Sequence, residues 1–238
     1  KPAIPYVETV HDRIVLEICR GCTRSCRFCR AGYIYRPLRE RNTGDVLDII
    51  RNGIKNTGYD EVSLLSLSCS DYSAIEQLLL SLSKEYEGEG VKISLPSLRI
   101  NNFSLKLADL VKTARKSSLT FAPEAGSQRL RDVINKNVTE EQILSTLKEA
   151  ERMGWQQIKL YFMLGLPTET EEDVLAIAEL ANKAARETRL RLTVSVSHFV
   201  PQPYTPFQWE SMEKRENLKE KVYLLKKNLN RSEEHTSE

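Results

Sequence analysis

The sequence lacks several features that would place it in a specialised class. It has no apolar run near the roughly 20 residues that a membrane-spanning helix needs, and its start lacks the layout of a signal peptide. It has no internal repeat and no low-complexity linker. Its net charge of +2 gives no reason by itself to expect a polyanionic partner, although local basic runs still count. We therefore expect a cytoplasmic globular protein.

Cysteine is scarce but strongly clustered. The 238 residues contain five cysteines, and four of them, Cys19, Cys22, Cys26 and Cys29, are close together, whereas Cys69 stands alone. A secreted disulfide scaffold would distribute an even number of cysteines along a shorter chain. The clustering in a chain of this size indicates metal binding or redox chemistry.

The two ends of the sequence differ from its middle. Residues 1–12 form a proline-containing lead-in, which we expect to follow a further domain upstream. Residues 231–238 resemble the translation of a sequencing-adapter read-through, so we expect that they do not belong to the natural protein. We expect residues 13–209 to form one core domain and residues 210–230 to form a C-terminal helix.

Short β-branched runs alternate with amphipathic segments, which is typical of parallel βα units and predicts an α/β fold. We expect six strands, at residues 13–19, 61–68, 91–95, 118–122, 157–164 and 190–200. We expect helices at residues 43–56, 73–87, 105–115, 139–153, 171–187 and 214–229. Thr43 is the expected N-cap of the first helix, and Thr139 with Gln142 has the spacing of a capping box. The last helix is basic, and we expect it to be a solvated packing helix.

The loop after the first expected strand carries the strongest chemical signal. Cys22, Cys26 and Cys29 follow the spacing C-x3-C-x2-C, which allows three thiolates to converge on one centre. Iron–sulfur clusters normally take four cysteine thiolates. Three would leave one iron open for a ligand with an amino and a carboxylate group, as S-adenosylmethionine (SAM) offers. Four arginines flank the loop and would offset the charge of the cluster: Arg20, Arg24, Arg27 and Arg30.

A structural zinc site is the alternative for the same cysteines. It would need a fourth ligand, either Cys19 or Cys69, and such sites usually show paired C-x2-C knuckles or cysteine–histidine combinations. Cys19 falls in the first expected strand, where we expect a core or lining residue. The spacing favours the cluster, and a zinc-stabilised, non-enzymatic RNA-binding module stays open as an alternative.

Three groups of motifs resemble one known superfamily. The pattern C-x3-C-x-F-C, with Phe28 before the last cysteine, resembles the signature of the radical SAM superfamily. Residues 121–136 (FAPEAGSQRL followed by INK) and 164–173 (LGLPTETEED) resemble tRNA methylthiotransferases and their cobalamin-dependent relatives. Residues 33–41, 64–72 and 199–209 resemble cobalamin-domain-containing radical SAM proteins without an assigned substrate.

The resemblance implies a partial (βα)6 TIM-like barrel, open and built of parallel strands, with a [4Fe–4S] cluster on Cys22, Cys26 and Cys29. It implies reductive cleavage of SAM to a 5′-deoxyadenosyl radical, with a reductant such as flavodoxin or ferredoxin. The substrate, RNA or protein, is unidentified, and the expected reaction is methyl or another carbon-centred transfer. Cobalamin would require a domain upstream of Lys1, because the sequence has no D-x-H-x-x-G motif.

A tRNA methylthiotransferase is the other enzymatic alternative. That reaction would require further cluster cysteines upstream and an RNA-binding barrel downstream.

The resemblance also implies which residues bind SAM, since the active sites of parallel barrels lie at the carboxyl ends of the strands. The expected SAM contacts are Phe28 and Gly165–Leu166 near the adenine, Ser68 near the amino group, Glu124 at the ribose and Arg99 at the carboxylate. At Ser68, small polar residues replace the usual Gly-Gly-Glu, so we expect backbone contacts there.

Each of these residues has a structural alternative. Glu124 could cap a helix from Ser127, Arg99 could form a salt bridge, and the Gly165 segment could be a simple strand-to-helix turn. Cys69 could be a small buried residue. Three residues near the end of the last strand could face the substrate, namely His198, Tyr204 and Trp209. Tyr161 and Met163 are expected in the core.

Overall fold

The computed structural model describes residues 7, 12–94, 100 and 119–229. The chain forms two compact units, one of residues 1–24 and 31–120 (unit 1) and one of residues 25–30 and 121–238 (unit 2). Arg99 and the helix expected at residues 105–115 lie outside the described residues.

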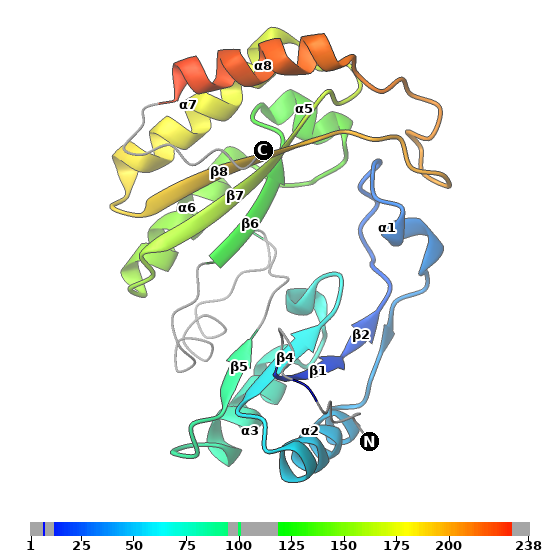
Figure 1. Ribbon diagram of the computed structural model, residues 1–238, viewed down its shortest axis with the longest axis vertical. Helices are drawn as coiled ribbons and strands as arrows, with labels where there is room; N and C mark the ends of the chain where they lie inside the picture. Colours follow the sequence, from blue (N-terminus) through cyan, green and yellow to red (C-terminus); the bar gives the residue numbers. More distant parts are fainter. Residues whose placement is uncertain (1–6, 8–11, 95–99, 101–118, 230–238) are drawn as a thin grey trace. The chain divides into compact units, whose positions relative to one another are not determined.

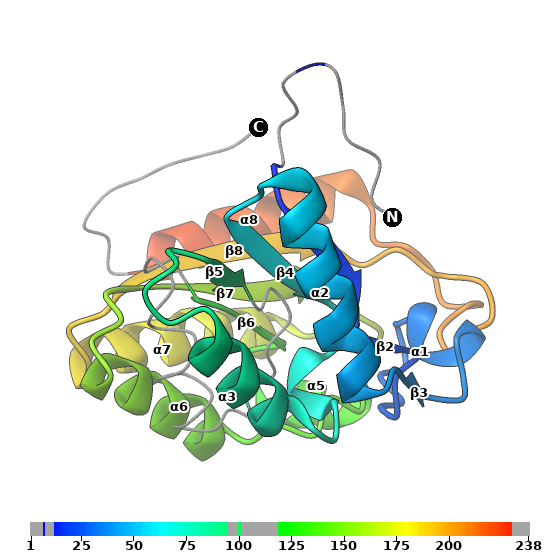
Figure 2. The same ribbon diagram turned by 90° about the horizontal axis from the view of Figure 1, so that it is seen from below.

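Unit 1 contains a parallel sheet with the strand order β1 (Ile14–Glu17), β4 (Glu61–Leu65) and β5 (Lys92–Ser94). In β1, Ile14 and Leu16 are buried whereas Val15 is exposed, so one face of the sheet is covered. Helices α2 (Thr43–Thr57) and α3 (Ile75–Glu85) provide buried apolar residues for this core (Figure 2). Gly53 of α2 allows the close contact, because a Cβ there would lie 2.7 Å from Ile14.

Unit 1 also contains three short elements around the cysteine loop. Strands β2 (Cys19–Arg20) and β3 (Arg39–Glu40) pair in an antiparallel manner. Helix α1 (Ala31–Ile34) lies between them in the sequence, and the 3-10 helix η1 (Cys69–Asp71) follows β4. The sequence pattern predicts none of these elements except the end of the first strand.

Unit 2 contains the sheet β6 (Leu119–Glu124), β7 (Gln157–Leu164) and β8 (Arg191–His198), in that order, with β7 and β8 parallel. Its helices are α5 (Gln128–Val133), α6 (Glu140–Arg152), α7 (Glu171–Glu187) and α8 (Arg215–Asn228). In Figure 1, α8 runs along α7, with which it packs. Alternate residues of β7, such as Ile158 and Phe162, form the core of this unit.

The structure confirms the α/β prediction, with open sheets and parallel strands separated by helices. Strand β7 and helix α7 have the predicted bounds, and the Thr139–Gln142 capping box is present. Two details differ. The N-cap of α2 is Asn42 rather than Thr43, because the Asn42 side chain accepts the Gly44 N–H at 2.8 Å. The first expected strand is divided, because β1 ends at Glu17 and the next residues pair with β3.

Within the described ranges, no helix combines the length and the apolar character that crossing a bilayer requires.

Candidate functional site

The first cysteine of the loop is held in unit 1 by polar contacts. The Arg24 N–H donates to Cys22 Sγ at 3.4 Å. The Arg24 guanidinium forms a two-point ion pair with Asp71 of η1, with Nη2 at 2.9 Å from Oδ1 and Nε at 3.3 Å from Oδ2. Asp71 is nearly buried, since 9% of its side chain is exposed. The segment around Cys22 is therefore held by the ion pair with Asp71 of η1 and by the Arg36 guanidinium, which donates to Arg24 O at 3.1 Å.

The other two cysteines belong to unit 2, where backbone contacts hold them. The Arg27 N–H donates to Ile134 O at 3.0 Å, and the Asn135 side chain donates to Ser25 O at 2.9 Å. Within the loop, the Cys29 N–H donates to Cys26 O at 3.1 Å, which closes a tight turn. Residues 134–135, which follow α5, thus fix the position of Cys26 and Cys29.

Apolar packing reinforces this second half of the loop. Phe28, between the two cysteines, packs against one buried cluster of unit 2. Each motif of unit 2 that resembles the superfamily, at residues 121–136, 164–173 and 199–209, contributes residues to this cluster. Its buried members are Ala125, Leu130, Ile134, Met163, Leu166, Phe199 and Phe207. The structure therefore brings the Phe28 ring, the segment after β6 and the turn after β7 together.

The chemistry of the three cysteines fits an iron–sulfur cluster. None of the three forms a disulfide, and Cys26 is buried whereas Cys22 and Cys29 are partly exposed. No three Cys, His, Asp or Glu side chains are grouped as a metal site among the residues that the structure describes. Cys22 belongs to one unit and the other two cysteines to the second, so the fit rests on the donor set of three cysteine sulfurs that are not in disulfides.

The two remaining cysteines have structural positions. Cys69 is completely buried, and its Sγ donates to Leu64 O at 3.1 Å. Cys19 is also buried, and this burial raises the pKa of its thiol. Both are small buried residues, as expected for Cys19 and as the alternative for Cys69 had it, and the burial of Cys19 disfavours the thiolate that a zinc ligand needs.

The end of the β4 segment offers small hydroxyl groups. Ser68 is buried, its N–H donates to Ser66 Oγ at 2.9 Å, and its Oγ lies 3.5 Å from Ser70 Oγ. These residues lie beside Asp71, the partner of Arg24, in unit 1. The prediction that Ser68 contacts SAM stays a prediction.

Glu124 ends β6 with its carboxylate in a defined position. Its Oε1 accepts a hydrogen bond from Lys136 Nζ at 3.1 Å, and both side chains are mostly buried. Its backbone is in the left-handed region, with φ of 70°, which is uncommon for a residue other than glycine. The alternative role of Glu124 as a cap of the next helix is wrong, because Ser127 is the N-cap of α5 and accepts the Leu130 N–H.

The turn after β7 is held by α8. Gly165 has φ of 78°, and a Cβ there would lie 2.9 Å from the Cβ of Glu213. Its N–H donates to Glu169 Oε1 at 2.8 Å, and the same oxygen accepts from Lys221 Nζ of α8 at 2.8 Å. Lys221 also donates to Glu213 Oε2 at 2.9 Å. The sequence pattern missed this role of α8, because Lys221 is 52 residues from Glu169 and no local spacing relates them.

The candidates at the end of β8 and beyond are exposed rather than packed in the apolar cluster. His198, Tyr204 and Trp209 are exposed, Trp209 by 89%. Met163 is in the apolar cluster, as expected. Tyr161 is only partly buried, so its prediction as a core residue is wrong, and Lys159 Nζ lies 4.8 Å from the centre of its ring.

Comparison with known proteins assigns the chain to the class of protein that the cysteine motif indicates. The family model of the radical SAM superfamily matches residues 16–181. An uncharacterized protein of Methanocaldococcus jannaschii is 39% identical over 199 residues, which cover 84% of this chain and 43% of that protein. The tRNA-2-methylthio-N(6)-dimethylallyladenosine synthase of Thermotoga petrophila is 28% identical, and the match covers 80% of this chain and 44% of the synthase.

The fold agrees with that class. The structure of the radical S-adenosylmethionine methyltransferase TsrM from Kitasatospora setae, solved with tryptophan and a SAM analogue, matches with a TM-score of 0.68. The match covers 84% of this chain and 38% of TsrM, at 15% identity.

The protein is thus an α/β enzyme built from parallel strands with interleaved helices. The chain belongs to the radical SAM superfamily, whose members use a [4Fe–4S] cluster and SAM. It spans less than half the length of the curated relatives that it matches.

Proposed function

We propose that this chain is the SAM-cleaving core of an enzyme that transfers a methyl or another carbon-centred group. In this proposal Cys22, Cys26 and Cys29 hold the cluster, which with SAM supplies a 5′-deoxyadenosyl radical when both are bound. The observation that carries the proposal is the apolar cluster of unit 2, which joins Phe28 of the cysteine loop to Leu166 and Ile134 of the other motifs.

The residues of unit 2 would then have separate tasks. Phe28 and Leu166 offer an apolar surface suited to a purine ring. The Glu124 carboxylate, fixed by Lys136, can accept hydrogen bonds from the two ribose hydroxyls. Gly165 adds a close backbone approach, because the left-handed turn leaves no side chain there. Backbone carbonyl oxygens near Ser68 of unit 1 would accept hydrogen bonds from the SAM amino group, and Arg99 would pair with the SAM carboxylate.

The relatives support transfer chemistry without fixing the substrate. The match to a tRNA methylthiotransferase and the fold match to a methyltransferase both support a group-transfer reaction. Family membership leaves the zinc-stabilised, non-enzymatic alternative without support. A flavodoxin or ferredoxin would supply the electron, and cobalamin would need a domain outside this chain.

The decisive test uses the complete protein, reconstituted with iron and sulfide without oxygen. Wild type should bind about four irons per chain and release 5′-deoxyadenosine from SAM under reductant. Replacing Cys22, Cys26 or Cys29 by serine should abolish the visible absorbance of the cluster and the release of 5′-deoxyadenosine. Cys19→Ser is the matched control and should retain both. A fully loaded wild-type protein that releases no 5′-deoxyadenosine would contradict the proposal.

A further inference from the structure

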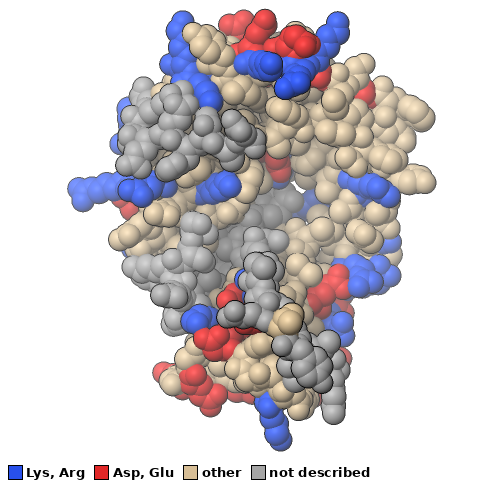
Figure 3. Space-filling model, in the orientation of Figure 1, with Lys and Arg blue, Asp and Glu red and all other residues tan. Residues whose placement is uncertain are grey.

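The segment around the cysteine loop is far more basic than the chain as a whole. Residues 20–41 contain seven arginines and one acidic residue, which gives this stretch +6, whereas the whole chain carries +2. The rest of the chain is therefore negative. Charge concentrated in this way is a feature of proteins that bind polyanions. On the face drawn in Figure 3, blue side chains gather along the right-hand edge, where Figure 1 places α1 and β2.

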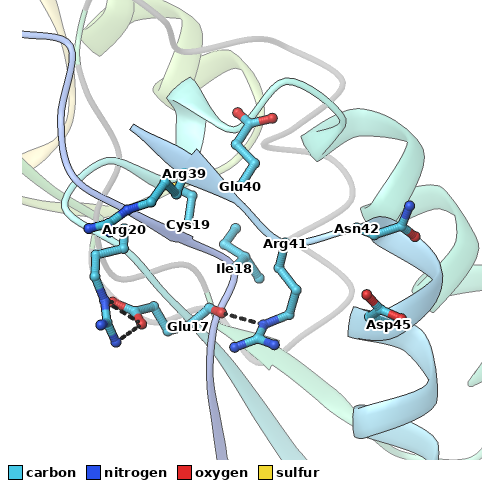
Figure 4. A pocket seen from close by; sticks show the side chains of 9 residues that line it. All are labelled: Glu17, Ile18, Cys19, Arg20, Arg39, Glu40, Arg41, Asn42 and Asp45. Atoms are coloured by element: carbon cyan, nitrogen blue, oxygen red, sulfur yellow. Dashed lines mark hydrogen bonds and ion pairs between the residues drawn. The ribbon is translucent and has the colours of Figure 1, made fainter. Parts of the chain in front are cut away.

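Three of these arginines line a cavity of about 460 Å³ in unit 1. The cavity lies between the end of β1, the β2–β3 pair and the start of α2. Its walls come from Glu17, Ile18, Cys19, Arg20, Arg39, Glu40, Arg41, Asn42 and Asp45 (Figure 4).

The cavity wall carries three arginines and three carboxylates, so the partners of each group decide which charges an anion would meet. Arg20 is paired with Glu17, with Nη2 at 2.6 Å from Oε2. The exposed Arg39 side chain has no side-chain hydrogen bond or ion pair within the described ranges, although the Glu17 carboxylate is near enough to attract both it and Arg41. Arg41 donates from Nε to the backbone oxygen of Glu17 at 3.2 Å and has no carboxylate partner within the described ranges. Two guanidinium groups are therefore available to an anion.

The other two carboxylates of the wall, Glu40 and Asp45, interact with groups other than these arginines. Glu40 accepts from the backbone N–H of Ser73 at 2.8 Å and also from its hydroxyl, and it points away from Arg20 and Arg41 in Figure 4. Asp45 lies in the first turn of α2, where its charge interacts favourably with the helix dipole.

The strand register adds a second argument for an anion. Arg20 and Arg39 are direct partners in the antiparallel β2–β3 pair. Like charges in this position destabilise a strand pair. Glu17 forms an ion pair with Arg20 and attracts Arg39 more weakly, and a bound phosphate between the two strands would offset the repulsion that remains.

Exposed aromatic and apolar side chains lie close to these arginines in the sequence. Tyr35 is 46% exposed and Ile34 is 41% exposed, and Arg36 stacks on the Tyr33 ring at 5.2 Å. Gly21 packs against this segment, since a Cβ there would lie 2.5 Å from Tyr35 O. The exposed ring of Tyr35 is thus held beside the residue that precedes Cys22. Aromatic rings next to arginines are the usual surface for unstacked bases.

We propose that the Arg20–Arg39–Arg41 cavity binds the phosphate backbone of a single-stranded RNA segment, which makes RNA the substrate class of the enzyme. This inference rests on the proposed function, because it names the substrate of that reaction. The exposure of Arg39 and Arg41 and the nearby Tyr35 favour an extended strand over a small, enclosed anion.

The test measures binding of a fluorescein-labelled, mixed-sequence RNA of about 16 nucleotides to the complete, cluster-loaded protein by fluorescence anisotropy. The variant Arg39→Gln/Arg41→Gln should bind about tenfold more weakly, and its salt dependence between about 50 and 200 mM should be shallower by about one to two contacts. Arg39→Lys/Arg41→Lys should keep the wild-type salt dependence. It also keeps the test decisive if the glutamine variant does not fold.

The matched control is Arg189→Gln/Arg191→Gln, an exposed pair with the same spacing in unit 2. It removes the same charge and should leave RNA binding unchanged. The inference would be overturned if this control lost RNA affinity equally, or if the Arg39→Gln/Arg41→Gln variant bound RNA as tightly as wild type. It would also be overturned if wild type bound no RNA. Displacement of RNA by millimolar inorganic phosphate at constant ionic strength, or by polyglutamate as readily as by unlabelled RNA, would do the same.

The assay contains neither SAM nor reductant, so RNA binding is measured independently of radical chemistry. Release of 5′-deoxyadenosine is measured separately on the same preparations. A protein that cleaves SAM but does not bind RNA would therefore overturn this inference alone and leave the proposed function intact.

Discussion

The two units hold their parts of the cysteine loop by different physical means. Unit 1 holds the Cys22 segment through the Arg24–Asp71 ion pair, with 29% of the Arg24 side chain exposed. Unit 2 holds Cys26 and Cys29 through backbone hydrogen bonds and the packing of Phe28. Salt screens partly exposed charges but hardly affects apolar burial. One part of the loop should therefore respond to ionic conditions, while the other should not.

The buried Lys221–Glu169 ion pair of unit 2 tests whether the burial of a group or its charge determines how its contribution to stability responds to salt. Only 2% of the Glu169 side chain is exposed, and Lys221→Met would leave its carboxylate buried without a cation. We expect a loss of about 3 kcal/mol of stability, seen as a lower urea midpoint followed by Trp155 fluorescence. The exposed Lys219→Met is the control and should have little effect. A loss that disappears at high salt would mean that Lys221 behaves like a surface charge.

Replacing Phe28 tests whether apolar packing holds the part of the cysteine loop that belongs to unit 2. Phe28→Ala should destabilise unit 2 by about 2 kcal/mol, because a partly buried ring leaves the apolar cluster. The loss should be the same at low and high salt, measured by urea unfolding. Phe28→Leu retains apolar contact and should recover most of the stability. A strong salt dependence of the Phe28→Ala effect would contradict apolar anchoring.

Replacing Arg24 tests whether the ion pair with Asp71 holds the part of the cysteine loop that belongs to unit 1. Arg24→Gln should cost about 1 to 2 kcal/mol, because Asp71 is nearly buried and loses its cation. The difference from wild type should shrink as salt rises, since the wild-type pair is itself screened. Urea unfolding at two salt concentrations measures this. Arg51→Gln removes a more exposed ion pair of unit 1 and serves as the control.

The smallest expected effect concerns pH. The hydrogen bond from Lys221 lowers the pKa of Glu213 from its ordinary 4.5. A carboxyl group whose pKa is lower in the folded state adds stability above its ordinary pKa and loses that contribution as the pH falls through the lowered value. Glu213→Gln should therefore lose less stability than wild type below pH 4.5. The measurement is the urea midpoint against pH, with the exposed Glu216→Gln as control.

The sequence predicts the long elements of both units well, because periodicity and caps agree there. The bounds of β7 and α7 follow from an apolar run and from acidic residues after Thr170. The β2–β3 pair was missed because two residues per strand leave no periodic signal. The Glu124–Lys136 contact needs left-handed backbone at Asn135 and Asn137, which spacing alone does not specify.

The candidate site was predictable only in part. The resemblance identified the motifs that contain Phe28, Leu166 and Ile134, and the structure brings these three into one cluster. Lys221 fixes the Gly165 turn through Glu169, and this contact joins residues that are 52 positions apart in the sequence. Local pattern therefore located the motifs, whereas the contacts that fix them came from packing.

Glu124 shows a compromise between folding and recognition. Its left-handed backbone costs about 1 kcal/mol or more relative to glycine, which adopts this conformation freely. A glycine there would make the chain easier to fold but would leave Lys136 without its carboxylate. Selection for thermal tolerance would therefore favour replacing Glu124 by glycine, and such a variant would lose the carboxylate that we propose as the partner of the ribose hydroxyls.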